Sequence, residues 1–164
     1  MKMLAAVAAL CVATAVVSSA SYTQKYRSRV SLIDRTTDFS KLKTYAWLES
    51  HLVADIELHA QIVTAIDHEF SALGMAKAAP ASADVVVTYA AYSRTDVRFK
   101  APEIEKDVRP SYAVGTLVVS VLAPHYMKPL LELRADTPVE RASRAAKVVD
   151  TVSEMFKLYP RRRH

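Results

Sequence analysis

The sequence is poor in two residues on which several common functional sites depend. It has one cysteine, Cys11, and only two glycines, Gly74 and Gly115, among 164 residues. A phosphate-binding loop, a dinucleotide-binding turn and a nucleophile elbow each need glycine where the backbone turns tightly or approaches a ligand. A single cysteine cannot form a disulfide within the chain or a metal site built from several thiolates. These shortages argue against nucleotide-binding enzymes, hydrolases with a nucleophile elbow and cysteine-based metal proteins.

A long hydrophobic run occurs only at the start of the chain, where Lys2 precedes an apolar stretch that ends in small residues at Ser18–Ala20. This is the pattern of a signal peptide. We therefore predict a signal peptide over residues 1–20, cleaved between Ala20 and Ser21. An uncleaved membrane anchor is the alternative, although the run is at the short limit for a bilayer span. Lipoprotein processing needs a small residue before the lipidated cysteine, but Leu10 precedes Cys11. We therefore predict a periplasmic or secreted protein, with an outer-membrane lipoprotein as the less favoured alternative.

The composition predicts one ordinary globular domain after the signal peptide. The whole chain is 51% hydrophobic, and no later segment has the length of a membrane span. Lysine and arginine number 22 against 17 acidic residues, a mildly basic balance that is no nucleic-acid signature. The most concentrated basic feature is the tail at 161–164. There, Arg161–Arg163 are interpreted either as a solvated end or as a contact to an anionic surface.

Periodicity and turn residues predict an α+β domain over residues 30–160, preceded by a polar tether at 21–29. A helix is expected over 56–73, with Asp55 as its N-cap and Gly74 at its end. Its apolar stripe is expected to comprise Ile56, Ile62, Val63, Ile66, Phe70 and Leu73. Strands are expected at 30–34, 42–48, 84–92, 116–122 and 131–136.

A second helix is predicted from Thr137 as N-cap, with Pro138 at the first helical position and Glu140 completing a capping box. Its buried stripe would comprise Ala142, Ala145, Ala146, Val149, Val152, Phe156 and Tyr159. The element order is then ββαβββα. Short hairpin connections favour a single two-layer domain, with a mostly antiparallel sheet of about five strands and two helices on one face.

Three segments resemble motifs of the bacterial domain-of-unknown-function family 4136. They are Asp-Phe-Ser-Lys-Leu-Lys-Thr-Tyr-Ala-Trp at 38–47, Gly-Thr-Leu-Val-Val at 115–119 and Met-Phe-Lys-Leu-Tyr-Pro at 155–160. The resemblance runs from about Val30 to Pro160. It implies a secreted or envelope-associated protein, often a lipoprotein, with no assigned activity and no catalytic residues to carry over.

Candidate catalytic and metal-binding residues are few. His51, Asp55 and His59 are spaced by four, which would place them on one helix face as metal ligands. Asp55 has a simpler role as the helix cap, so no metal site is predicted. Neither a Ser/His/Asp arrangement nor a pair of carboxylates stands out. We therefore expect no catalytic residues, no cofactor and no enzymatic activity.

The strongest candidate for a binding surface follows the third predicted strand. From Ser93 the residues alternate between charged and apolar, which predicts a strand that runs out beyond the core into a charged loop at 101–112. The predicted partner surface comprises Arg94, Asp96, Arg98, Phe99, Lys100 and Arg109. Interleaved aromatics and cations can bind single-stranded nucleic acid, but export argues against that ligand.

The sequence thus predicts an exported, non-enzymatic envelope protein that acts as a binding or assembly module. Its partner would be an envelope protein or a cell-wall component. The alternative is a small-molecule or lipid carrier with a pocket between the helices and the sheet.

Overall fold

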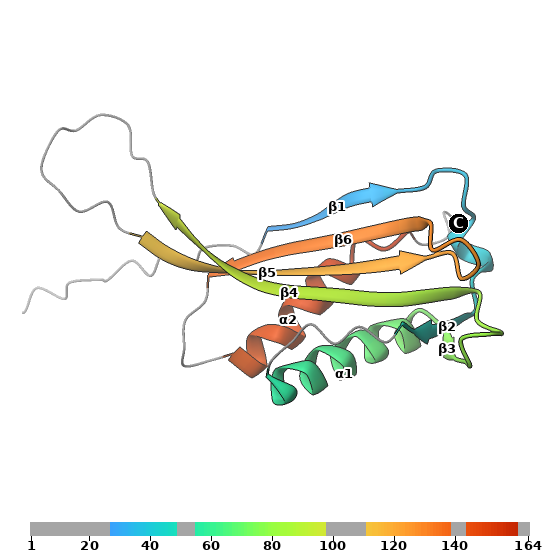
Figure 1. Ribbon diagram of the computed structural model, residues 1–164, viewed down its shortest axis with the longest axis horizontal. Helices are drawn as coiled ribbons and strands as arrows, with labels where there is room; N and C mark the ends of the chain where they lie inside the picture. The colour runs from blue at the N-terminus through green and yellow to red at the C-terminus, as the bar shows by residue number, and fades with distance from the viewer. Residues whose placement is uncertain (1–26, 49–54, 98–110, 139–143, 161–164) are drawn as a thin grey trace, which may run out of the picture.

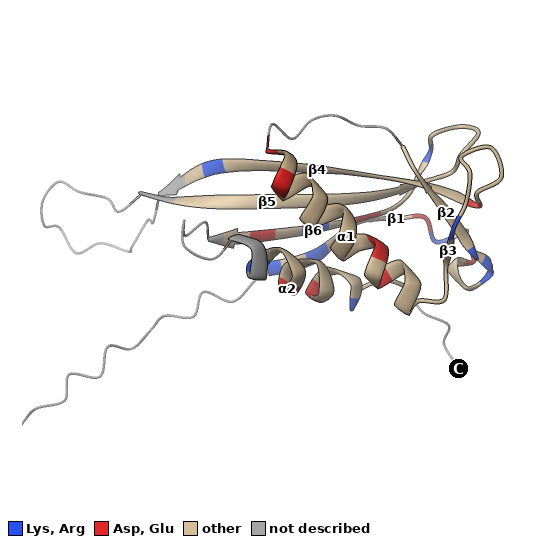
Figure 2. Cartoon of the chain, turned by 90° about the horizontal axis from the view of Figure 1, so that it is seen from below, with Lys and Arg blue, Asp and Glu red and all other residues tan. Residues whose placement is uncertain are grey.

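A computed structural model describes residues 27–48, 55–97, 111–138 and 144–160. Two helices lie on one side of a six-stranded sheet (Figures 1 and 2). The elements in chain order are β1 (Arg27–Ile33), η1 (Phe39–Lys41), β2 (Thr44–Trp47), α1 (Ile56–Ala72), β3 (Ala76–Lys77), β4 (Val85–Val97), β5 (Ser111–Leu122), β6 (Pro129–Pro138) and α2 (Arg144–Phe156). The α+β class and the placement of both helices on one face agree with the prediction.

The sheet differs from the prediction in strand number and direction. Its order is β1-β6-β5-β4-β2-β3, and the first four strands in that order pair antiparallel. Strand β2 instead pairs parallel with both β3 and β4, because α1 carries the chain back before the next strand begins. The sheet is therefore mixed and has six strands rather than about five. The additional strand, β3, has two residues, too few to show any alternation in the sequence.

Helix α1 begins and ends where its local signals predict. The Asp55 carboxylate accepts a hydrogen bond from the backbone N–H of Leu58 at 3.0 Å, and Gly74 has a φ of 77° just after the helix. A left-handed φ of this kind favours glycine because it has no Cβ. The predicted stripe is wrong at its first position, since Ile56 is 83% exposed.

The boundary between β6 and α2 corrects the predicted capping box. Thr137 and Pro138 do not start a helix. They are the last residues of β6, where they pair with Gly115 and Val114 of β5. Pairing along the long strand β5 outweighs the local helix-start pattern. The described part of helix α2 covers Arg144–Phe156.

Strand β1 also corrects the predicted tether at 21–29. The strand begins at Arg27 and not at Val30, and its first three residues pair with Asp136, Ala135 and Arg134 of β6. A one-residue irregularity follows at Ser31, between the paired Val30 and Leu32. The N-terminal strand therefore lies at the edge of the sheet beside the last strand of the chain (Figure 1).

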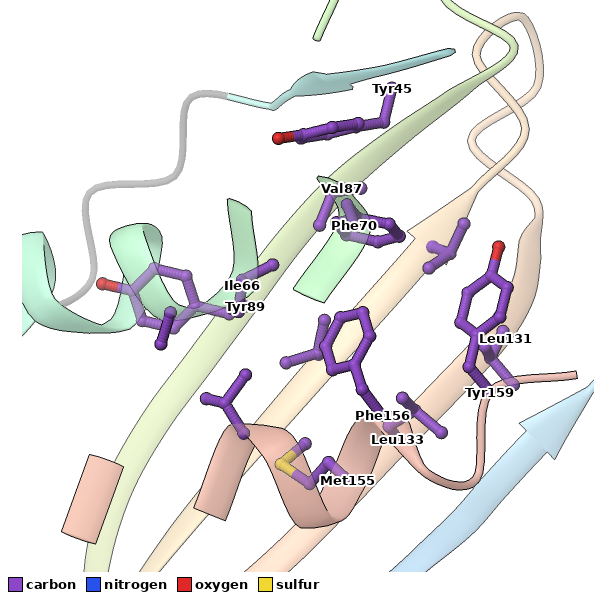
Figure 3. Close-up of a cluster of buried hydrophobic side chains, with 14 of the residues drawn as sticks. Tyr45, Ile66, Phe70, Val87, Tyr89, Leu131, Leu133, Met155, Phe156 and Tyr159 are labelled. Carbon is purple, nitrogen blue, oxygen red and sulfur yellow. The ribbon is translucent and has the colours of Figure 1, made fainter. Parts of the chain in front are cut away.

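The core lies between the helices and the sheet. The Phe70 ring of α1 contacts the Phe156 ring of α2 edge-on with centroids 5.0 Å apart, and it stacks on Tyr45 at 4.6 Å (Figure 3). Leu131 and Leu133 of β6 are fully buried beneath them. Burial also raises the pKa of Tyr159 to about 12. Val149, predicted to be buried, is instead 55% exposed, although its spacing from Val152 and Phe156 places it on the same side of α2.

The opposite face of the sheet is covered by no helix of the described segments (Figures 1 and 2). Because side chains alternate along a strand, this open face receives the residues between the buried core positions. At its β2 end it carries a small apolar cluster of Ala46, Ala83, Val86 and Leu122. Toward the other end its side chains become polar and charged, and there the candidate site lies.

Candidate functional site: an arginine cluster on the open face

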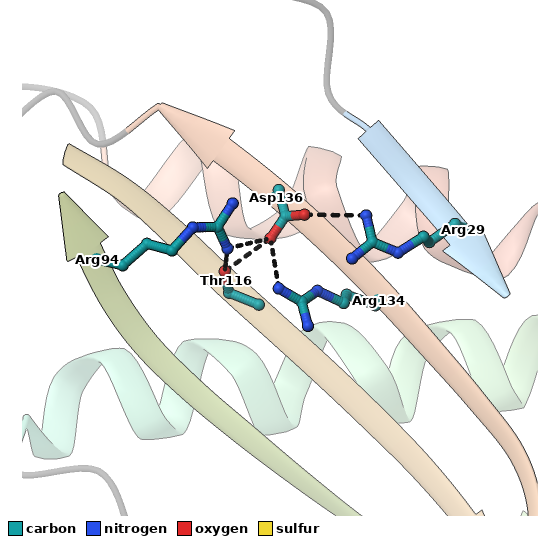
Figure 4. Close-up of polar contacts among 5 residues, drawn as sticks. All are labelled: Arg29, Arg94, Thr116, Arg134 and Asp136. Carbon is teal, nitrogen blue, oxygen red and sulfur yellow. Dashed lines mark hydrogen bonds and ion pairs between the residues drawn. The ribbon is translucent and has the colours of Figure 1, made fainter. Parts of the chain in front are cut away.

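Four neighbouring strands bring charged side chains together on the open face. The register pairs Thr116 of β5 with Asp136 of β6, and Arg29 of β1 with Arg134 of β6. Arg94 of β4 is two residues from Tyr92, the partner of Thr116, so it lies diagonally across from that threonine. We call Arg29, Arg94 and Arg134 the arginine cluster, because all three guanidinium groups contact the Asp136 carboxylate (Figure 4).

Asp136 is the acceptor at the centre of the cluster. Its Oδ2 atom accepts from Arg29 Nη1 at 3.1 Å, and its Oδ1 atom accepts from Arg94 Nη1 at 3.1 Å. The Thr116 hydroxyl donates to Oδ1 at 2.7 Å and accepts from Arg94 at 2.9 Å. Arg134 Nη2 lies 3.4 Å from the same Oδ1. One carboxylate therefore orients side chains from four other positions on the sheet.

The electrostatics of the cluster favour an ionised Asp136. Burial opposes ionisation, but the hydrogen bonds from Thr116 and Arg94, together with the charge of Arg134, outweigh it and lower the pKa of the carboxyl. The Asp136 side chain is 13% exposed, whereas those of Arg29, Arg94 and Arg134 are 50%, 37% and 25% exposed. The carboxylate thus lies beneath guanidinium groups that remain accessible to a ligand.

Two neighbours extend the cluster. Arg27 pairs directly with Asp136 across the β1–β6 ladder, so its exposed side chain lies on the same face. Tyr92, which is 46% exposed, lies beside the cluster with its ring centroid 6.0 Å from the Arg134 guanidinium carbon. The arginine cluster and Arg27 thus form a cationic surface, and the accessible ring of Tyr92 lies at its border.

The structure describes only part of the predicted partner surface. Arg94 belongs to the arginine cluster, and Asp96 lies further along β4 opposite Tyr112 of β5. The remaining predicted residues are outside the described segments, namely Arg98, Phe99, Lys100 and Arg109. The same holds for the predicted cleavage site at Ala20 and Ser21 and for Arg161–Arg163.

Sequence reasoning missed the partners of Arg94. Arg134 and Asp136 belong to the strand predicted at 131–136, and the sequence assigns them no role. Arg29 was assigned to the tether. The available signal was the alternation of Arg27 and Arg29 with Ser28 and Val30, which is typical of an edge strand with one charged face.

Of His51, Asp55 and His59, which are spaced by four in the sequence, the structure describes Asp55 and His59. Asp55 caps α1, and His59 Nδ1 lies 2.6 Å from the Tyr89 hydroxyl, with the two rings stacked. His51 is outside the described segments. Among the residues that the structure describes, no three histidine, cysteine or carboxylate side chains are grouped as metal ligands would be.

The segment at 38–47 has a structural role. The Tyr45 hydroxyl and the Trp47 indole N–H both donate to Asp67 Oδ1 of α1, at 2.7 and 2.8 Å. Lys77 of β3 contacts the other oxygen of Asp67 at 3.1 Å. Asp67 therefore joins α1 to the two strands at one edge of the sheet.

The same segment is tied to β4 through Asp84. The Asp84 carboxylate accepts hydrogen bonds from the backbone N–H groups of Lys43 and Thr44, at 2.8 and 2.9 Å, and these bonds lower its pKa. These contacts give Lys43, Thr44, Tyr45 and Trp47 a role in holding the sheet edge together.

A small cleft lies away from the open face. It has a volume of about 310 Å³ and lies between η1, the C-terminal end of α1 and the segment after α2. Its surface is about equally polar and apolar, with Ser40 and Lys43 among its lining residues; the lining also includes Phe39, Leu42, Leu73, Met75, Tyr159 and Pro160. Its volume is at the lower end of the range of ligand pockets.

Comparison with protein families matches residues 29–161 to the domain of unknown function DUF4136. The chain belongs to this family, as the resemblance at 38–47, 115–119 and 155–160 implied. No curated protein sequence matches the chain. Neither helix of the described segments is both long and apolar enough to cross a bilayer.

Solved structures share the fold at low sequence identity. A PDZ domain protein from Parabacteroides distasonis is 15% identical, with a TM-score of 0.62 over 85% of this chain and 36% of its own. The present chain thus corresponds to about a third of that protein. PelC from Paraburkholderia phytofirmans, solved as a dodecamer, is 9% identical, with a TM-score of 0.56 over 84% of this chain and 100% of its own. At these identities the similarity establishes the fold.

Proposed function

We propose that this chain is an exported, non-enzymatic binding or assembly module of the bacterial cell envelope. Its binding surface would be the open face around the arginine cluster, continued by the predicted partner surface from Arg94 to Arg109. The observation that carries the proposal is the convergence of three arginines from β1, β4 and β6 on the face that no described helix covers. The backbone positions of these side chains are fixed, because each lies on a paired strand.

Photo-crosslinking at Tyr92 tests whether the open face is the binding surface. A photo-crosslinking amino acid is placed at position 92 in the full-length chain and, as a matched control, at Tyr126. Tyr126 is 86% exposed in the hairpin between β5 and β6, at the opposite end of these strands. We expect irradiation of whole cells to give one discrete adduct, with protein, glycan or lipid, from position 92 and none from position 126. Equal labelling from both positions, or no adduct from position 92, contradicts the proposal.

Assembly of several copies is the form of this function that strand β1 favours. β1 is an edge strand on which Val30, Leu32 and Ile33 are 37%, 39% and 41% exposed, and edges of this kind pair readily with another chain. PelC, which shares the fold, was solved as a dodecamer. Light scattering of the mature chain should give a mass above the monomer, and Leu32→Lys should reduce it. A monomer at micromolar concentration restricts the function to binding.

A carrier for a small amphiphile is the second candidate, and the cleft near Tyr159 supports it. Its lining combines apolar side chains with Ser40 and Lys43, which suits a ligand with an apolar body and a negatively charged polar group. Filling the cleft with Leu73→Trp should abolish uptake of a fluorescent fatty-acid probe by the mature chain. Lack of probe binding by the unmodified chain rejects this candidate.

A further inference from the structure

We propose that the arginine cluster, together with Arg27, binds a phosphate group carried by a sugar or a lipid. This inference rests on the proposed function, because it names the ligand class for the same surface. It follows from the charge, geometry and exposure of the residues on the open face.

Positive charge exceeds negative charge among the described residues of this surface. Arg94 makes a further interaction beyond those with Asp136 and Thr116, so it is left out of the balance. Arg27, Arg29 and Arg134 supply three positive charges. Asp136 and Glu132, which lies two residues from Arg134 on the same face of β6, supply two negative charges. The surface is therefore positive by about one charge without Arg94, and it attracts a phosphate monoester, which carries −1.5 to −2 at neutral pH.

The geometry leaves donors available to a ligand. A guanidinium has five N–H donors, and Arg29 and Arg134 each direct only one terminal nitrogen at Asp136. The remaining terminal N–H groups of Arg134, whose side chain is 25% exposed, are the donors that a ligand can reach, whereas its Nε is buried. The Arg29 side chain is half exposed. Asp136 acts as a positioning residue, because it holds like-charged groups together from below.

A phosphate fits this arrangement better than a carboxylate does. Guanidinium groups on separate strands can each meet a different oxygen of a tetrahedral phosphate, whereas a planar carboxylate offers two oxygens. The exposed ring of Tyr92 borders the cluster and provides an apolar surface for the sugar ring or glycerol that carries the phosphate. The expected ligand is therefore a phosphorylated glycan or a phospholipid headgroup, which share the same phosphate chemistry.

Calorimetric titration of the mature chain tests the inference. The probes are inorganic phosphate and glycerol phosphate, with acetate at the same ionic strength as the reference anion. We expect both phosphates to bind at least tenfold more tightly than acetate. Arg29→Gln and Arg134→Gln should each weaken phosphate binding by about tenfold, since each removes charge-assisted hydrogen bonds. Arg29→Lys should fall between, because it keeps the charge and loses the planar fork.

The matched control is Arg35→Gln, an exposed arginine just beyond the opposite end of β1. It should leave phosphate affinity unchanged. Circular dichroism melting of every variant separates loss of binding from loss of fold. Phosphate that binds no better than acetate, or binding that Arg35→Gln weakens as much as Arg29→Gln, overturns the inference.

Vesicles distinguish the two sources of phosphate. Phosphatidylcholine vesicles with and without phosphatidic acid are compared by cosedimentation. Binding that requires phosphatidic acid supports a lipid headgroup, whereas binding of soluble phosphates alone supports a glycan. The proposed function fails separately, through the crosslinking at Tyr92, which does not depend on the chemistry of the ligand.

Discussion

Replacing Asp67 with alanine should destabilise the fold by about 2–4 kcal/mol. The Tyr45 hydroxyl, on a residue that is 3% exposed, would lose its acceptor, and a buried unsatisfied donor costs about 1–3 kcal/mol. The Trp47 indole N–H is only partly buried, so water can replace part of its bond. The contact with Lys77, whose side chain is 55% exposed, contributes about 0–1 kcal/mol. The total is a large fraction of the 5–15 kcal/mol typical of a domain.

Urea unfolding of the mature chain measures this loss. Trp47 is the only tryptophan, so its fluorescence reports on the site, and circular dichroism reports on the whole fold. Asp67→Asn keeps an acceptor oxygen and should lose less than half as much. Asp150→Ala, an exposed aspartate on α2, should change stability by less than about 0.5 kcal/mol. A loss below about 1 kcal/mol for Asp67→Ala would refute the view that Asp67 joins α1 to the sheet edge.

Four further results are expected. Phe156→Ala should cost about 3–5 kcal/mol in urea unfolding, because the ring is 1% exposed in the core, whereas Val149→Ala, at a site 55% exposed, should be nearly neutral; similar losses would contradict the assigned burial. Gly74→Ala should cost about 1 kcal/mol, entirely through its φ of 77°, since an added Cβ meets no atom within 4 Å; an unchanged midpoint would contradict this. The pKa of Asp136 is lowered in the folded state, so its contribution to the free energy of unfolding is complete above the unfolded pKa of about 3.9 and is lost as pH falls. The stability difference between the unmodified chain and Asp136→Asn should therefore shrink from pH 6 to pH 3. A constant difference would argue against an ionised Asp136. Intact-mass spectrometry of the exported protein should give a chain that starts at Ser21, and a heavier, acylated product would support lipoprotein processing instead.

Local signals were sufficient to predict α1 from the sequence. The Asp55 cap, the spacing of Ile62, Ile66 and Phe70, and the left-handed Gly74 all act within one helix, so no knowledge of distant partners is needed. The same kind of local pattern failed at Thr137 and Pro138. There the choice between helix and strand depends on pairing with β5, which is a non-local interaction that a capping box does not register.

The candidate site was only partly predictable for the same reason. Alternation placed Arg94 on an exposed strand, but alternation along one strand does not say which strand lies beside it. The neighbours of β4 and β6 follow from the sheet order, which places β1 next to β6 and thereby brings Arg29 to Asp136. The sequence therefore predicts that Arg94 is exposed on its own strand. It does not predict that Arg29 and Asp136 lie beside it.

Because β1 lies next to β6, the cationic surface of the open face can form only after β6 is present. Arg29 and Asp136 are 107 residues apart in the chain, and their contact requires β1 to pair with β6. A fragment that stops before β6 lacks the central carboxylate, and it also lacks the edge on which β1 is held. The cationic surface is thus a property of the completed molecule. Products of interrupted synthesis or proteolysis that lack β6 would therefore lack this cationic surface.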